Sequence, residues 1–86
     1  MGKPVVFSKH ADYKLQLLRE HGFNLSKKEI EEVVINPDRI SSGYVGRKIA
    51  ERVISKQHIL RVVFEDLPRQ FKIITMYPSR RGRYEN

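Results

Sequence analysis

The sequence predicts a single α+β domain in which one short strand and two helices precede an antiparallel β-meander. Three observations predict this class. The chain of 86 residues is long enough for one modest hydrophobic core. Apolar residues recur at helical spacing in the N-terminal part and alternate as in strands after Asp38. Hydrophobic residues make up 40% and charged residues 31% of the chain, a globular balance, so we expect residues 1–86 to form one domain.

The N-terminal segment predicts a strand followed directly by a helix. Pro4 to Phe7 is a β-branched run that favours an edge strand, where Pro4 is tolerated. Ser8 stands where a helix N-cap belongs, and the segment from Lys9 to His21 has apolar residues at helical spacing. Gly22 is placed to end this helix in a left-handed conformation.

A second helix is predicted immediately afterwards. Ser26 and Glu29 have the spacing of a capping box. An apolar stripe follows, formed by Ile30, Val33 and Val34. Asn36-Pro37 ends the helix, because a residue before proline avoids the α region. Two short helices with a tight connection predict an antiparallel helix hairpin packed on one face of the sheet.

The rest of the chain predicts strands. We expect them at Arg39–Ser42, Lys48–Ser55, Ile59–Phe64 and Phe71–Tyr77. Gly43 and Gly46 indicate a turn, and residues Asp66 to Arg69 are predicted to form the last hairpin loop.

Alternation in the strand after His58 predicts an uncovered sheet face. Leu60, Val62 and Phe64 share one side, and Arg61 points to the other. If the apolar set packs under the helices, Arg61 stands on the open face. Tyr77 and the arginine-rich segment after Pro78 leave the neighbouring strand nearby, so several cations are expected to converge there. Guanidinium groups suit phosphate because they are planar, always charged and donate in pairs.

Composition narrows the function. Seventeen Lys and Arg against ten Asp and Glu give a net charge of +7, which predicts affinity for polyanions. The chain has no cysteine, which excludes disulfides and thiolate chemistry. No apolar run approaches the ~20 residues of a membrane span, and the N-terminus lacks a signal-peptide core, so a cytoplasmic protein is expected. Three scattered histidines predict no metal site, and no cofactor is expected.

The order of elements and two motifs resemble the RelE/ParE toxin superfamily. The motifs are the Leu-Arg-Val-Val-Phe strand and the Ile-Ile-Thr-Met-Tyr-Pro strand with its Arg-Arg-Gly-Arg-Tyr tail. The resemblance implies a toxin of a toxin–antitoxin pair. RelE-like members cut mRNA on the ribosome without metal, ParE-like members poison DNA gyrase, and an acidic antitoxin neutralises either.

The resemblance also implies a set of site residues. The catalytic roles fall by position on Arg61, on Arg80 or Arg81, and on Tyr84. Arg47 and Lys48 correspond, less closely, to the family's lysine-rich loop. RNA-binding roles are expected for Arg47, Lys48, Tyr77, Arg80 and Arg83.

Metal-free RNA cleavage needs a base for the 2′-hydroxyl, cations for the charge developing on phosphorus, and an acid for the leaving oxygen. Arginine stays protonated, so it suits the second role and not the first. The base is therefore expected to be Tyr84, or a histidine such as His10 or His58.

Other readings remain open at this point. The chain could be a non-catalytic ParE-like toxin, a basic module that binds nucleic acid or a partner, or a relative that lost its activity. Arg61 could be an ordinary charge on a solvated sheet face, and the terminal arginines a solvated tail. Tyr44, between two glycines, is expected to be a turn-capping aromatic, and stacking on a base is the alternative.

Overall fold

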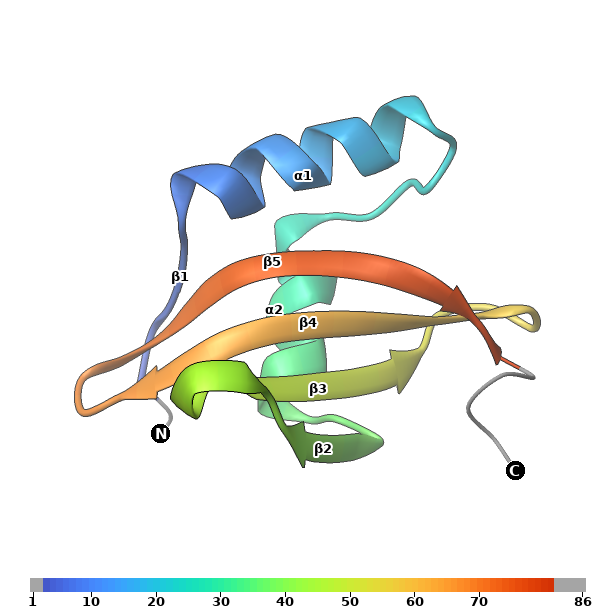
Figure 1. The fold of residues 1–86 in the computed structure, drawn as a ribbon. Coiled ribbons are helices and arrows are strands. Elements are labelled where there is room, and N and C mark those ends of the chain that lie inside the picture. Colours follow the sequence, from blue (N-terminus) through green and yellow to red (C-terminus); the bar gives the residue numbers. More distant parts are fainter. Residues whose placement is uncertain (1–2, 82–86) are drawn as a thin grey trace.

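The computed structural model describes residues 3–81, so Arg83 and Tyr84, both predicted site residues, lie outside the described residues (Figure 1). Within this range the protein is an α+β fold with two α-helices and one five-stranded mixed sheet. In chain order the elements are β1 (Val5–Phe7), α1 (Lys9–Glu20), α2 (Lys27–Ile35), β2 (Arg39–Ser42), the short 3₁₀ helix η1 (Tyr44–Gly46), β3 (Lys48–Val53), β4 (His58–Leu67) and β5 (Gln70–Arg80). The coarse class and the order of elements agree with the sequence prediction.

The sheet has the strand order β1-β5-β4-β3-β2. The strands from β2 to β5 form an antiparallel meander. β1 lies parallel to β5 at one edge, with Phe7 opposite Ile73. The first strand of the chain is therefore an edge strand of the sheet, next to the last strand.

Local signals set the helix ends. Ser8 caps α1 by accepting a hydrogen bond from the Ala11 backbone N–H at 3.0 Å. Ser26 and Glu29 form both hydrogen bonds of the capping box that starts α2. Gly22 follows α1 with a φ of 92°, a conformation that glycine adopts without a steric cost. The predicted caps and helix limits are confirmed.

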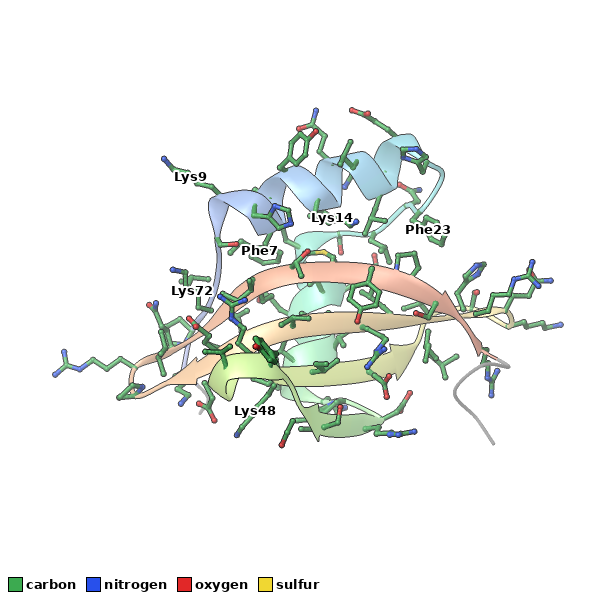
Figure 2. The ribbon with its side chains drawn as sticks, viewed as in Figure 1. Phe7, Lys9, Lys14, Phe23, Lys48 and Lys72 are labelled. Atoms are coloured by element: carbon green, nitrogen blue, oxygen red, sulfur yellow. The ribbon has the colours of Figure 1, made fainter. Side chains whose placement is uncertain are left out.

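The two helices cover the same face of the sheet, but they do not form the predicted antiparallel hairpin. Figure 1 shows α1 lying along β5, whereas α2 crosses behind the inner strands. The cause lies in the connection between them. Leu25 is buried and Phe23 packs against the core, so this segment is anchored to the protein interior and redirects the chain. Figure 2 shows Phe7 and Phe23 at opposite ends of α1.

The alternation predicted for β4 is confirmed. Leu60, Val62 and Phe64 belong to the core beneath the helices. Side chains alternate along a strand, so Arg61 lies on the other face. In Figure 1 that face is turned toward the viewer, and within residues 3–81 neither α-helix lies in front of it. We call it the open face.

The final hairpin is longer than predicted. Leu67 pairs with Gln70, so only Pro68 and Arg69 form the turn, and the assignment of Asp66 and Leu67 to a loop was wrong. β5 also continues through Pro78, where the apolar run was expected to stop. Pairing with β1 reaches no farther than Ile73, so past that point β5 has no strand on its outer edge. A proline is tolerated on such an edge because its missing N–H breaks no ladder bond.

A bulge at Ile74 adapts β5 to the N-terminal segment. Val63 pairs with Thr75 and Phe64 with Ile73, which leaves Ile74 as the extra residue. The Ser8 hydroxyl donates to the carbonyl oxygen of Ile74 at 3.1 Å, and the Ser8 N–H donates to that of Ile73. The start of α1 is thereby fixed to β5. None of the helices in the described part of the chain is long and apolar enough to cross a membrane.

Candidate functional site on the open face

A row of four side chains crosses the open face at one register. Arg39 of β2 pairs with Glu51 of β3, Glu51 pairs with Arg61 of β4, and Arg61 pairs with Tyr77 of β5. Directly opposed residues in antiparallel strands lie about 5 Å apart and point to the same face. These four residues are called the open-face row. Antiparallel pairing explains how residues distant in sequence come together there.

Glu51 is the anchor of the row. It is only 6% exposed and is the one buried charged residue of the described chain. Its Oε2 lies 2.8 Å from Nε of Arg61, and its Oε1 lies 3.5 Å from Nε of Arg39. A buried carboxylate requires such compensation, because removing it from water is costly. Two arginines and one glutamate leave the row with a single net positive charge.

Arg61 is held between this carboxylate and an aromatic ring. Its Cζ lies 5.5 Å from the centroid of the Tyr77 ring, within cation–π distance. The side chain of Arg61 is 18% exposed, so its position is restricted while part of it still meets solvent. A restricted guanidinium group can bind a phosphate with little loss of side-chain entropy.

Neutral residues surround the row. On one side run Ser41, Ile49, Val63 and Thr75, and on the other run Val53, Ile59 and Ser79. None of these seven flanking residues carries a charge. The arginines of the row are therefore the cations that an anion would meet at the centre of the open face.

Arg80 and Arg81, both predicted site residues, lie at the end of β5. Arg80 pairs with His58, so alternation assigns it to the helix side of the sheet. Arg81 directly follows β5, and its backbone N–H donates to the carbonyl oxygen of Gln57 at 2.9 Å. The pair formed by Ile59 and Ser79 lies between this position and Arg61. The structure thus brings Tyr77 into contact with Arg61 and places Arg81 farther along the sheet.

The two histidines considered as bases are not on the open face. His10 is exposed in the first turn of α1, on the helix side. His58 shares the side of Leu60, and its ring meets Phe23 edge to face at 5.3 Å. A cavity of about 450 Å³ lies on that side, lined by residues of the α1–α2 connection and by Ile54, Ser55 and His58. Neither histidine is brought together with Arg61.

Arg47 and Lys48 lie at the opposite end of the sheet from Arg81. Nε of Arg47 is 3.6 Å from Oε2 of Glu65, and Nζ of Lys48 is 3.3 Å from Oδ2 of Asp66. Hydrogen bonds from Lys3 and Lys48 lower the pKa of Asp66. In Figure 2, Lys48 and Lys72 lie toward the end of the sheet that carries the β4–β5 turn. Arg47 and Lys48 each lie beside a carboxylate, and neither belongs to the open-face row.

Sequence reasoning missed Glu51 and Arg39. The sequence carries no clear signal for Glu51, because only Ala50 of β3 belongs to the core, whereas the apolar Ile49 and Val53 lie on the same face as Glu51. The position of Arg39 opposite Glu51 depends on the register between β2 and β3, which the sequence does not specify.

Comparisons with known proteins identify no family for this chain. No family model, no curated protein and no solved structure matches it. Among residues 3–81, no group of three or more histidine, cysteine or acidic side chains is placed to hold a metal ion.

Proposed function

We propose that this protein is a RelE-like toxin that cleaves mRNA on the ribosome without a metal ion, and that the open-face row binds the RNA backbone. The observation that carries the proposal is the restricted position of Arg61 between Glu51 and Tyr77 on an open face. The resemblance of the sequence to the RelE/ParE superfamily supplies the reaction type. The net charge of +7 supports a polyanionic substrate.

In the proposed reaction the 2′-hydroxyl oxygen attacks the adjacent phosphorus. A base removes the hydroxyl proton, a bond forms between O2′ and phosphorus, and the bond to the 5′ oxygen breaks. The leaving oxygen gains a proton, and the upstream fragment ends in a 2′,3′-cyclic phosphate. Arg61 donates to the phosphate oxygens as their charge grows, which is the role a fixed cation performs best.

The other residues have positioning, cationic and proton-transfer roles in this reaction. Glu51 and Tyr77 position Arg61, and Arg81 contributes a second cation from the end of β5. Tyr84 remains the candidate base, since His10 and His58 lie on the helix side. The proposed partners are ribosome-bound mRNA and an acidic antitoxin that covers the open face, in a cytoplasmic setting.

The test is to express the chain from a tightly repressed promoter and to map mRNA 5′ ends after induction. Arg61→Lys is the main variant, because lysine keeps a charge beside Glu51 but loses the planar pair of donors. Arg81→Ala and Tyr84→Phe test the strand end and the candidate base. Arg69→Ala is the matched control, since it removes an exposed arginine from the β4–β5 turn.

We expect growth arrest and codon-phased cuts with the wild type and the control, and a loss of both with Arg61→Lys. Cuts that persist in all the variants would contradict the proposal. Arrest with DNA damage and intact mRNA would instead identify a gyrase poison. Salt-dependent RNA binding without arrest would identify a binding module.

A further inference from the structure

The η1 turn presents an aromatic side chain to solvent. Tyr44 is 87% exposed and Val45 is 77% exposed, and they are the most exposed large hydrophobic residues of the described chain. A tyrosine that caps its own turn would be covered by it, so the turn-capping interpretation of Tyr44 is wrong. An aromatic ring so uncovered contributes little to folding.

The turn is held in one shape at a steric cost. Val45 has a φ of 56° and a ψ of 50°, a left-handed conformation that β-branched residues rarely adopt. The Gly43 N–H donates to the Arg47 carbonyl oxygen at 2.6 Å, and a Cβ at Gly43 would lie 2.9 Å from that oxygen. Gly46 also has a positive φ, of 74°. The chain therefore maintains a tight turn that exposes two apolar residues.

The turn borders the open face. Arg47, directly after η1, lies 3.6 Å from Glu65 of β4. Glu65 is on the same face as Arg61, four residues farther along β4, or about 13 Å. Figure 1 shows η1 at that end of the sheet, in front of the strands. A few nucleotides of single-stranded RNA span such a distance.

We propose that Tyr44 stacks on an unpaired base of a single-stranded RNA whose backbone lies along the open face. This inference rests on the proposed function, and it adds a base-contacting subsite to it. Single-stranded RNA is the occupant that matches both features, because it offers phosphates to Arg39, Arg47 and Arg61 and a flat base to Tyr44. Arg39 and Arg47 keep 64% and 43% of their side chains exposed.

Tyr44→Trp gives a direct probe, since the protein contains no other tryptophan. The ligand is a short single-stranded RNA with 2′-O-methyl groups, which the proposed reaction cannot cleave. Stacking predicts that this RNA quenches the tryptophan fluorescence, while inorganic polyphosphate, which has charge and no bases, does not. Quenching by both ligands, or by neither, would overturn the proposal.

Affinity measurements complete the test. Tyr44→Ala is expected to weaken binding of the same RNA at least about fivefold and to leave the salt dependence unchanged. Tyr44→Phe should bind as the wild type does. Tyr13→Ala is the matched control, because Tyr13 is 61% exposed on α1, away from the open face.

These measurements distinguish a failure of the stacking subsite from a failure of the proposed function. If Arg61→Lys weakens RNA binding and Tyr44→Ala does not, the stacking subsite is refuted and the proposed function stands. If neither variant changes RNA binding, both are refuted. Loss of binding to a neutralising protein, with RNA affinity unchanged, would reassign Tyr44 to a protein contact and overturn the proposal.

Discussion

Glu51 and Arg61 face each other across β3 and β4, with Oε2 of the carboxylate 2.8 Å from Nε of the guanidinium group. The glutamate is buried and the arginine is largely buried, on the face of the sheet opposite the hydrophobic core. Each charge is the main compensation for the other. Losing one partner therefore leaves an uncompensated charge in a poorly solvated place.

Glu51→Gln is expected to destabilise the protein by about 2–3 kcal/mol, somewhat less than the cost of breaking a fully buried pair. The measurement is the free energy of unfolding in urea. Glu65→Gln is the matched control, because Glu65 pairs with Arg47 at 3.6 Å near the surface. That control should cost less than about 1 kcal/mol. Equal effects of the two changes would show that burial of Glu51 does not matter.

The lowered pKa of Asp66 leads us to expect that the stability of the protein depends on pH. Lys3 and Lys48 donate hydrogen bonds to its carboxylate and lower its pKa below 3.8. A carboxyl group with a lowered folded-state pKa contributes stability above its unfolded pKa, and loses that contribution as the pH falls through the folded value. We expect Asp66→Asn to lower the melting temperature at pH 7 and the difference to shrink below about pH 4. A difference that stays constant over this range would contradict the assignment.

Val45→Asn is expected to stabilise the protein by about 0.5–1 kcal/mol. The left-handed backbone costs valine more than asparagine, and the exposed side chain loses almost no packing. Thermal unfolding measures the effect. Val53→Asn is the control, because Val53 is also partly exposed but lies in β3 with ordinary strand geometry. A stabilised control or a destabilised Val45→Asn would argue against strain in the turn.

Ser26→Ala is expected to cost about 1 kcal/mol of stability. The Ser26 hydroxyl accepts a hydrogen bond from the Glu29 N–H at 3.1 Å, and the Ser26 N–H donates to the Glu29 carboxylate at 2.9 Å. Both bonds satisfy backbone groups that the first turn of a helix leaves open. Chemical denaturation of this variant beside Lys28→Ala, an exposed change in the same turn, separates the cap from helix propensity. A Ser26→Ala variant as stable as the control would show that the cap is dispensable.

The local features of this protein follow from residues that are close together in the chain. Ser8, Ser26 and Gly22 act within a few residues of themselves, so caps and helix ends followed from neighbours in the chain. The alternation around Arg61 depends only on the period of a strand, so the face of that arginine was predictable as well.

Features that depend on strand register or on packing between distant segments could be recognised only in the folded protein. The angle between the helices followed from the burial of Leu25 and Phe23 against the sheet. The contact of Arg61 with Glu51 and Tyr77 followed from the pairing of three strands, because a shift by one residue would reverse every side chain. The alternation of side chains along a strand is set by the local backbone. The register between strands is set by the packing of the whole core, and the open-face row forms only in that register.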